Sequence, residues 1–471
     1  MAISKSAIDT LKAKLSAASE IVTPDSEKYA DSIKRWSTAA EKPAGLVVYP
    51  TTAEDVSKIV LFAKDNKYEL AVVGGGHGTS GASSTDGGVC IDLSKMRKVT
   101  VDVEAKTVTA QGGALWKDVD DEAEKYRLAA VGGTVNHTGI GGLTLGGGFG
   151  YLSPAHGLVI DNLLSVEMVL ADGSIVTVSD SQNPDLFWAI KGAGIGFGVA
   201  TTFVYKAHDQ KNPVWGGMLV FPKPLLGGVI DMANKVLQES SPGKLMLMGF
   251  GSLPPENIPM VMAVVWFNGS EEDAKVYYKP LLDLGPVANM TQTMPYSGSN
   301  EMVNAAMGHG LRRSTKGSAF LAPLDLKFAD SMWDEYVTFI ESNPDVGASG
   351  IFWEFVPFKK IVEVPQTATA FANRGAYGNI LFQPTWTDPK NDILCREWTR
   401  KMSVKAKAEL ERRKAEGTDQ TTKQSVGEYG NYDALGASGK VVFGVNFPRL
   451  AELKKRYDPQ NIFSKGPSLQ V

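Results

Sequence analysis

Cysteine is scarce in this sequence: only Cys90 and Cys395 occur among 471 residues. Two cysteines so far apart are weak evidence for a disulfide, and neither lies in a CxxC or Cys/His spacing, so we expect no metal site. An excess of one charge is also lacking, since 48 Lys and Arg accompany 52 Asp and Glu, for a net charge of −4. No basic cluster is interleaved with aromatic residues, so we expect no nucleic-acid partner.

Long hydrophobic runs are missing too. No stretch approaches the roughly eighteen apolar residues that a membrane span needs, so we expect no membrane partner. The segment Met1–Leu15 is amphipathic and charged and lacks the apolar core of a secretory signal. Unless the chain has been trimmed, the sequence therefore predicts a cytoplasmic protein. Internal repeats are absent, which excludes solenoids and propellers.

Glycine, by contrast, is abundant, with 49 residues, and 43% of the chain is hydrophobic. This length and composition predict a well-buried globular protein of roughly two to four domains. Over about the first two hundred residues, strand and helix signals alternate. The predicted elements are strands Leu46–Pro50 and Leu70–Val73, a helix Ala53–Asn66 capped by Thr52, and hairpins of Val99–Val103 with Thr107–Gln111 and of Leu164–Leu170 with Ile175–Val178.

The pattern changes near Lys211-Asn-Pro213. From there, strands are mixed with long amphipathic helices. The clearest are strands Leu245–Phe250 and Val261–Phe267 and helices Asp325–Ser342 and Asp392–Glu416. The final segment, Val441–Phe463, is predicted to be a strand followed by a helix that closes at Asp458-Pro459. Together these patterns predict an α+β fold with two lobes.

Two glycine-rich segments are the most informative part of the sequence. The first, Gly74-Gly-Gly-His-Gly-Thr-Ser80, directly follows a predicted buried strand. Its glycines let the backbone turn sharply and bring several N–H groups together, a nest suited to a pyrophosphate, although the spacing is not that of a Rossmann fingerprint. The second, Gly132–Gly150, has nine glycines among nineteen residues. Two such loops predict an extended dinucleotide cofactor lying between them.

With these loops the sequence resembles the FAD-linked oxidases of the vanillyl-alcohol oxidase and para-cresol methylhydroxylase superfamily, particularly the berberine-bridge-enzyme-like branch. The likeness is strong in the first two hundred or so residues and near the C-terminus, and patchy between them. The matching motifs are Gly74–Gly78, Cys90–Met96, Gly141–Gly150, His156–Asn162, Asn183–Ala189, Lys191–Gly198, Asn446–Leu450 and Arg456–Phe463.

The resemblance implies a discontinuous FAD-binding lobe of the para-cresol methylhydroxylase type, formed by residues 1–212 with a core at 40–210 and completed by residues 426–471. Residues 213–425 would form a substrate lobe whose antiparallel sheet, with flanking helices, roofs the flavin ring. FAD would be held covalently through His77; the alternative is a loop histidine that caps a turn. The residues assigned to the cofactor are Gly74, Gly75, Gly76, His77, Gly78, Thr79, Ser80, Val135, His137, Thr138, Gly141, Gly142, Gly146, Gly147, Phe149, Gly150 and Asn446.

A second covalent bond, which many relatives make through a cysteine, is not expected, because Val135 stands at that position and neither cysteine matches it. His137 either contacts the flavin or substrate or makes a structural hydrogen bond in its loop. Thr138 falls where relatives keep a residue that admits or blocks dioxygen, and its small side chain favours an oxidase over a dehydrogenase. Phe149 replaces a tyrosine that several relatives place beside the reacting carbon.

Four residues are candidates for acid–base chemistry. Tyr429 and Tyr432 match an aromatic pair of the family and would remove a proton or orient the substrate; the alternative is a structural role. Alternation along its strand puts Glu354 opposite its aromatic neighbours, so it is a base if it faces the flavin and a surface residue otherwise. Glu363 lies near the place of a family base. Asn446 either supports the flavin's pyrimidine edge or caps the final helix.

Three functions stay open at this point. The first is an oxidase that transfers hydride from a small alcohol, amine or secondary metabolite to FAD and then reduces dioxygen to hydrogen peroxide. The second is an FAD-dependent dehydrogenase that uses another acceptor, and the third is a flavin-loaded binding protein without turnover. The substrate lobe carries no motif that names the substrate. We expect a monomer or a weak homo-oligomer.

Overall fold

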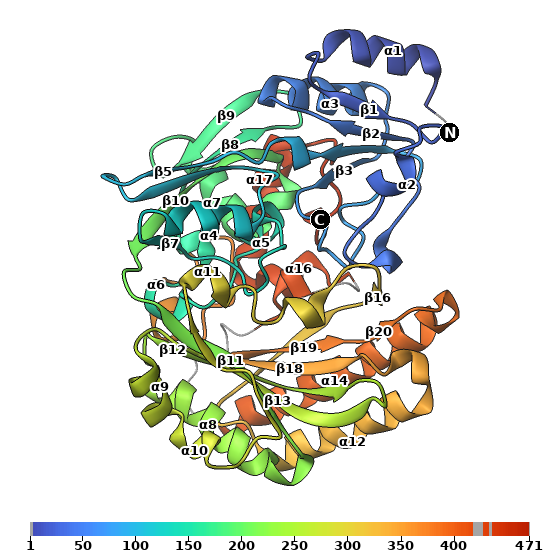
Figure 1. The fold of residues 1–471 in the computed structure, drawn as a ribbon. Coiled ribbons are helices and arrows are strands. Elements are labelled where there is room, and N and C mark those ends of the chain that lie inside the picture. Colours follow the sequence, from blue (N-terminus) through green and yellow to red (C-terminus); the bar gives the residue numbers. More distant parts are fainter. Residues whose placement is uncertain (1–2, 418–426, 433–435, 471) are drawn as a thin grey trace.

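The structure is a computed structural model that describes residues 3–417, 427–432 and 436–470. Figure 1 shows two lobes stacked one above the other. We call the upper one, residues 3–209 with residues 439–470, the first lobe, and the lower one, residues 214–416, the second lobe. Helices and mainly antiparallel strands occur in both, so the predicted two-lobed α+β fold is confirmed. The domain boundaries at residues 212 and 425 stay predictions.

The first lobe contains two sheets. A four-stranded sheet has the order β1 (Glu20–Val22), β2 (Leu46–Tyr49), β4 (Val89–Asp92), β3 (Leu70–Val73), and β4 pairs in parallel with both of its neighbours. An antiparallel sheet has the order β5 (Val99–Asp102), β6 (Thr107–Gln111), β10 (Val199–Asp209), β8 (Leu163–Val169), β9 (Ile175–Ser179), with β7 (Leu128–Ala130) on β10. Both predicted hairpins are therefore confirmed.

The helices of the first lobe begin and end near the sequence signals. As predicted, Thr52 caps α3: its hydroxyl accepts a hydrogen bond from the Asp55 N–H at 3.2 Å, which satisfies one of the free donors of the first turn. The helices are α1 (Lys5–Lys14), α2 (Tyr29–Ser32), α3 (Ala53–Asp65), α4 (Trp116–Glu124), α5 (Ile140–Leu145), α6 (Ser153–His156), α7 (Pro184–Ala193), α16 (Gly439–Phe443) and α17 (Phe447–Tyr457).

The second lobe is built on one large antiparallel sheet. Its order is β14 (Ala288–Asn289), β11 (Val214–Phe221), β13 (Ile258–Phe267), β12 (Lys244–Leu253), β18 (Gly350–Phe355), β19 (Gly378–Gln383), β17 (Lys316–Phe320), with β15 (Gln292–Met294) on β11. A small ribbon pairs β16 (Arg312–Arg313) with β20 (Thr385–Trp386). The helices are α8 (Leu226–Glu239), α9 (Glu271–Tyr277), α10 (Lys279–Leu282), α11 (Tyr296–Ser299), α12 (Leu326–Ser342), α13 (Lys359–Val362) and α14 (Asp392–Glu416).

Helices α8, α12 and α14 cover the face of this sheet that points away from the first lobe, as Figure 1 shows. Because side chains alternate along a strand, one set packs under these helices and the other faces the first lobe. Trp353 and Phe355 belong to the buried core beneath the helices. Glu354, between them, lies on the opposite face. The face of the sheet that these helices leave uncovered thus faces the first lobe.

The prediction of a strand at the start of the C-terminal segment was wrong. Residues Gly439–Phe443 form the short helix α16, and α17 follows it. The run Val441-Val442-Phe443 resembles a strand in composition, but the helix buries Val442 and Phe443 in the first-lobe core and leaves Val441 49% exposed. Packing against that core has overridden the local β preference. Among the described residues, no helix is long and apolar enough to cross a membrane.

Candidate active site

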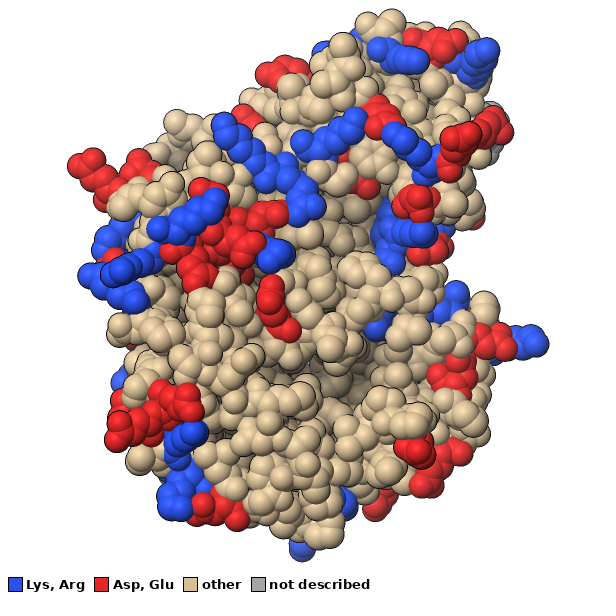
Figure 2. All heavy atoms as spheres, viewed as in Figure 1, with Lys and Arg blue, Asp and Glu red and all other residues tan. Residues whose placement is uncertain are grey.

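A cavity of about 740 Å³ lies between the lobes. Figure 2 shows the surface hollowed at this level, with few charged residues around the hollow. The two glycine loops form its wall on the first lobe, and strands β11, β12, β13, β18 and β19 form its wall on the second. Of the residues assigned to the cofactor, those that line the cavity are Gly74, Gly75, Gly76, His77, Gly78, Thr79, Ser80, Val135, Thr138, Gly141, Gly142 and Phe149.

The two glycine loops touch each other through their backbones. A β-carbon on Gly75 would lie 2.2 Å from the Gly139 nitrogen, and a β-carbon on Gly139 would lie equally close to the Gly75 nitrogen. By contrast, a β-carbon on Gly78 or Gly142 would meet no atom within 4 Å, because both face open space. Glycine is therefore required at the first pair for packing, and at the second pair it leaves room at the cavity wall.

The first loop also leaves hydrogen-bond donors unused. The backbone N–H groups of residues 77–80 donate to no group within the described residues, although their loop lines the cavity. A row of unpaired N–H groups at a glycine-rich turn is the arrangement that binds phosphate oxygens. Together with the space beside Gly78 and Gly142, it fits a bulky, anionic dinucleotide such as FAD.

Three of the glycines assigned to the cofactor, Gly146, Gly147 and Gly150, do not line the cavity. A β-carbon on Gly146 would lie 2.0 Å from the Asn431 amide oxygen, and one on Gly150 would lie 1.9 Å from the Gly132 carbonyl oxygen. Gly147 has a φ of +123° and lies against the Phe371 ring. The close approach of neighbouring protein segments is enough to require glycine at these positions.

His77 lies in a cluster of three histidines. Its ring stacks on Trp36 at 4.8 Å between centroids, and its Nε2 is 2.7 Å from Nδ1 of His137. Its other nitrogen, Nδ1, is 3.4 Å from the Thr138 hydroxyl. His309 of the second lobe completes the cluster, with its ring 4.9 Å from that of His137. His137 itself does not line the cavity; it stands behind His77.

The histidine cluster is held in the neutral form. Burial lowers the pKa of all three imidazoles, that of His77 well below its ordinary value and that of His137 to about 4, and the Arg313 guanidinium adds to each effect. No metal site was expected, yet the three histidines bring nitrogen atoms within 4.8 Å of one another, a spacing that could hold an ion. The nearby positive charge of Arg313 opposes a cation there.

Glu354 faces the cavity from the middle of β18. Tyr432 donates its hydroxyl proton to Oε1 at 2.5 Å, and the Asn379 amide donates to Oε2 at 2.8 Å. The side chain is buried, and desolvation raises the pKa of its carboxyl above the ordinary value. The structure therefore selects the cavity-facing alternative for Glu354 and joins it to Tyr432.

Tyr429 lines the cavity but its hydroxyl is already engaged. That oxygen accepts hydrogen bonds from the Gly148 N–H at 3.1 Å and from the Asn431 amide at 2.8 Å. Burial raises the pKa of Tyr429, and it raises that of Tyr432 well above the ordinary value. A phenol that holds its proton so firmly is a poor base, so Tyr429 fits an orienting role better.

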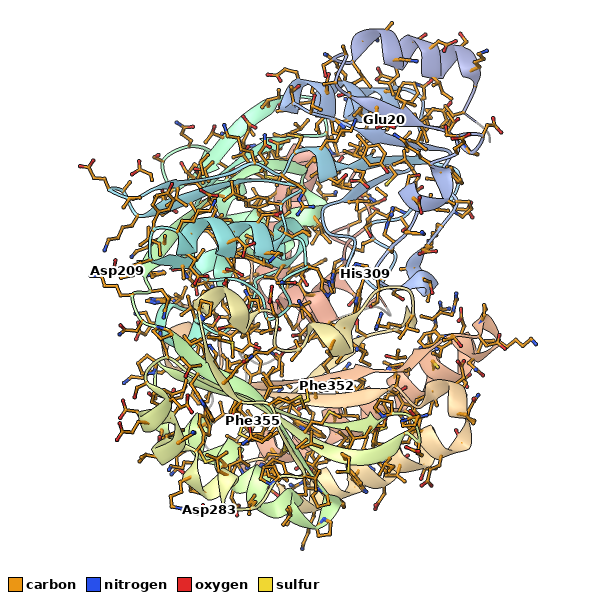
Figure 3. All side chains as sticks on the ribbon, viewed as in Figure 1. Glu20, Asp209, Asp283, His309, Phe352 and Phe355 are labelled. Carbon is orange, nitrogen blue, oxygen red and sulfur yellow. The ribbon has the colours of Figure 1, made fainter. Side chains whose placement is uncertain are left out.

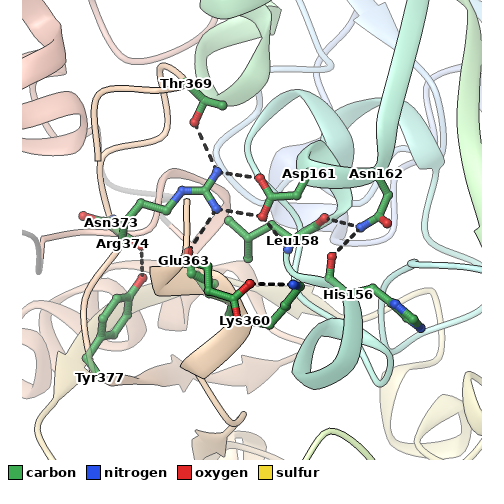
Figure 4. A network of polar contacts seen from close by, with 11 residues as sticks. His156, Leu158, Asp161, Asn162, Lys360, Glu363, Thr369, Asn373, Arg374 and Tyr377 are labelled. Atoms are coloured by element: carbon green, nitrogen blue, oxygen red, sulfur yellow. Dashed lines mark hydrogen bonds and ion pairs between the residues drawn. The ribbon is translucent and has the colours of Figure 1, made fainter. Parts of the chain in front are cut away.

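Glu363 and Asn446 lie away from the cavity. Figure 4 shows Glu363 at the end of α13, paired with Lys360, and its side chain is 52% exposed. Asn446 is buried, but its amide donates to the carbonyls of Gln366, Thr369 and Ala370, and it makes no capping bond to α17. Glu363 is therefore exposed outside the cavity, and Asn446 holds the loop before β19; the roles assigned to them stay predictions.

Sequence reasoning missed several residues of the site. Trp36 fixes the plane of the His77 ring, Asn379 holds the Glu354 carboxyl, and Lys465 lines the cavity near the C-terminus. His309 joins the histidine cluster from a segment far along the chain. A lone histidine between two glycines carries no signal of its own, and only the fold brings His309 to His77.

Family models match two parts of the chain: an FAD binding domain at residues 44–179 and a "berberine and berberine like" segment at residues 428–469. Over 93% of its length the chain is 36% identical to the FAD-linked oxidoreductase pgmH of Aspergillus terreus, of which it covers 90%. Over 94% of its length it is 29% identical to the FAD-linked oxidoreductase DDB_G0289697 of Dictyostelium discoideum, of which it covers 93%.

Solved structures resemble the whole chain. The 6-hydroxy-D-nicotine oxidase of Arthrobacter nicotinovorans superposes with a TM-score of 0.82 at 25% identity, covering 97% of this chain and 98% of that one. The xylooligosaccharide oxidase of Myceliophthora thermophila superposes with a TM-score of 0.80 at 21% identity, covering 98% and 99%. The second likeness shows the shared fold alone.

Proposed function

The chain belongs to the FAD-linked oxidoreductases of the berberine-bridge-enzyme-like family, and from this premise we propose that it is an oxidase with FAD bound covalently to His77. It would take hydride from a small alcohol, amine or secondary metabolite and pass the electrons to dioxygen, releasing hydrogen peroxide. One observation carries the proposal: a single cavity has His77 and the unpaired loop N–H groups on one wall and a buried carboxylate, Glu354, on the other.

FAD supplies the hydride acceptor when bound, and the protein must orient the substrate and remove its proton. Glu354 is the base in this proposal. Its raised pKa makes the carboxylate a stronger proton acceptor than an exposed glutamate, and the hydrogen bonds from Tyr432 and Asn379 hold it in place. Tyr432 keeps its proton and stabilises the carboxylate by donating a hydrogen bond to it.

The second-lobe wall indicates the character of the substrate. The side chains that the sheet turns into the cavity are mostly apolar: Met218, Leu247, Met262, Val264, Phe352 and Leu381. Such a wall favours an uncharged, largely apolar molecule with one O–H or N–H group to present to Glu354. An oligosaccharide would bury many hydroxyl groups against it without partners, which is unfavourable.

We also propose that the flavin bond is single and that dioxygen is the acceptor. Val135, which lines the cavity, has no nucleophile, while Cys90 and Cys395 are buried in β4 and α14 and do not line it. Thr138 also lines the cavity, beside His77, and its small side chain leaves room for dioxygen near the flavin.

The test begins with purified full-length protein. Acid-precipitated protein should stay yellow, and the flavin-bearing peptide should contain His77 and no cysteine thioether. A panel of neutral metabolites should yield at least one that bleaches the flavin without oxygen and releases hydrogen peroxide in air. Complete loss of flavin to the acid supernatant would refute the covalent bond. Bleaching of the flavin by a substrate without release of peroxide in air would indicate a dehydrogenase instead of an oxidase.

A variant at Thr138 separates the two half-reactions. A leucine side chain should fill the space beside the flavin, so Thr138→Leu should slow reoxidation of the reduced enzyme while substrate still reduces it. Thr138→Val, which replaces the hydroxyl by a methyl group of similar size, is the matched control and should reoxidise faster than the leucine variant. Equal rates in the wild type and Thr138→Leu would show that oxygen arrives by another route.

A further inference from the structure

We propose that His137 and His309 form a proton-transfer site for the self-catalysed attachment of FAD, in which His137 takes the proton of His77 and His309 passes it to solvent. This inference rests on the proposed covalent bond at His77. It assigns an activity to two histidines that do not line the cavity and have no part in substrate oxidation. His137 contacts His77 directly and His309 stands next to His137, so the order of transfer follows from the geometry.

The hydrogen bond between the rings sets which nitrogen of His77 is free to react. Nε2 of His77 and Nδ1 of His137 are 2.7 Å apart, so one of them carries the proton and the other accepts it. When Nε2 of His77 donates, its Nδ1 keeps an unshared electron pair, beside Thr138 at the cavity wall. His137 thus positions His77 with its nucleophilic nitrogen free.

The surroundings make a proton acceptor necessary. When Nδ1 of His77 forms a bond to carbon, the ring becomes a cation unless Nε2 releases its proton. The positively charged Arg313 lies over Trp36, at 4.4 Å from the ring centroid, and Trp36 stacks on His77. Burial and this cation disfavour charge on His77, and they lower the pKa of His137 as well, so the proton does not stay on His137 but passes on to the exposed His309.

His309 connects His137 to solvent and can accept its proton. When His137 accepts at Nδ1, its Nε2 carries a proton, and that atom is buried and without a partner in the described part of the chain. The His309 ring is 4.9 Å away and exposed to solvent. Figure 3 places His309 between the lobes, above the sheet that carries Phe352. Each of the three histidines offers one ring nitrogen within 4.8 Å of those of the other two, so the proton has a short distance to cross.

Contacts between the lobes fix the position of His137 relative to His309. Asn136, next to His137, donates its N–H to the Asn300 carbonyl at 2.8 Å and its amide to Glu301 at 2.9 Å. The same segment of the second lobe continues to His309 within a few residues. Attachment of FAD therefore depends on both lobes, although the bond itself forms in the first.

The reaction balances in atoms and electrons. Nδ1 of His77 forms a bond to the methyl carbon at position 8 of the flavin, one C–H bond of that methyl group breaks, and its proton leaves. The electron pair of the C–H bond stays on the flavin ring, which is thereby reduced. The methyl proton and the Nε2 proton equal the two that the reduced ring takes up. Dioxygen then accepts two electrons and two protons and leaves as hydrogen peroxide.

The test follows attachment rather than turnover. Full-length protein is produced without flavin, FAD is added, and acid-stable flavin fluorescence is measured on denaturing gels over time. Compared with wild type, His137→Ala should slow attachment about a hundredfold, in the range of a lost general base. His309→Asn should slow it about threefold to tenfold, because water replaces part of the exit route. His156→Asn, a half-buried histidine outside the cavity, is the matched control.

Chemical rescue separates proton transfer from packing. The His137→Ala variant has a space of imidazole's size, so added imidazole should restore the rate, which loss of packing alone would not permit. Reversible FAD binding and thermal stability should match the wild type. A wild-type rate in His137→Ala, or a slow rate that imidazole leaves unchanged, overturns the inference. Wild-type protein without any acid-stable flavin would instead refute the covalent bond itself, which is a separate outcome.

Discussion

At the scale of residues, burial decides which polar side chains have chemistry to offer. Two tyrosines and a glutamate meet at the cavity, and desolvation raises the pKa of each. The same shift has opposite consequences, because it makes the carboxylate a stronger base and keeps the phenols protonated. Glu354 therefore accepts protons, while Tyr432 donates to it and Tyr429 holds the Gly148 loop.

Glu354→Gln should slow anaerobic flavin reduction by about a hundredfold to ten-thousandfold, the range for a lost general base. The flavin spectrum and the acid-stable flavin should be unchanged. In the wild type the rate of flavin reduction should rise as the pH passes the raised pKa of Glu354, since only the carboxylate accepts a proton. In Glu354→Gln the rate should not show this rise with pH.

Glu363→Gln is the control for this prediction. Glu363 is an exposed glutamate that does not line the cavity, so the reduction rate should stay at the wild-type level. Flavin reduction at the wild-type rate in Glu354→Gln would show that another group is the base. A slow rate in Glu363→Gln would show that the loss is not specific to the cavity.

At the scale of elements, the two glycine loops act as one unit because their backbones touch. Gly139, at the start of α5, lies against Gly75 of the first loop, and no side chain fits between them. Gly142, one turn further along α5, lines the cavity, and a β-carbon added there would meet no atom within 4 Å. Glycines only three positions apart thus have different tasks, one in packing and one in leaving space.

Gly139→Ala and Gly142→Ala should separate these tasks. The first forces the loops apart, so it should lower the free energy of unfolding of the flavin-free protein by about 1–3 kcal/mol, the usual result of overpacking. The second adds a methyl group to open space within a helix and should leave that stability unchanged or raise it by up to about 1 kcal/mol. Denaturant unfolding measures both, and equal losses would contradict the assignment.

At the scale of the whole molecule, buried polar contacts join the lobes. Arg374 of the second lobe forms two hydrogen bonds of 2.7 Å with the Asp161 carboxylate of the first, as Figure 4 shows. Asn300 donates to Asp120 on α4 at 2.6 Å, also across the junction. Because the cavity has one wall on each lobe, contacts that join the lobes also hold its two walls together.

Asp161→Asn should destabilise the protein strongly, because it leaves the Arg374 guanidinium buried without its counter-charge, a change that typically costs about 3–5 kcal/mol. Thermal unfolding should show a lower Tm. Asp209→Asn breaks an exposed pair with Lys106 on the first lobe and should leave the Tm nearly unchanged, since exposed pairs are screened by solvent. Similar shifts in both variants would show that the junction is not held by this pair.

The sequence by itself determined the cofactor class and the first-lobe elements. Turn-forming glycines after a buried strand, Thr52 as a helix cap and the hairpin turns act through the local backbone, so their effect can be read without the fold. The assignment of His77 as the attachment residue came from the family resemblance and stays a prediction. These signals predicted β2, β3, α3 and both hairpins close to their observed bounds.

Only the tertiary structure decided which residues meet in the cavity. A glycine that leaves space at the cavity and one that packs against protein look alike in sequence, and only the fold shows that Gly146 and Gly150 pack against protein. Alternation placed Glu354 on one face of its strand, but only the sheet's position shows that this face is the cavity wall. His309 reaches His137 through contacts between residues far apart in the chain, and no local preference encodes such contacts.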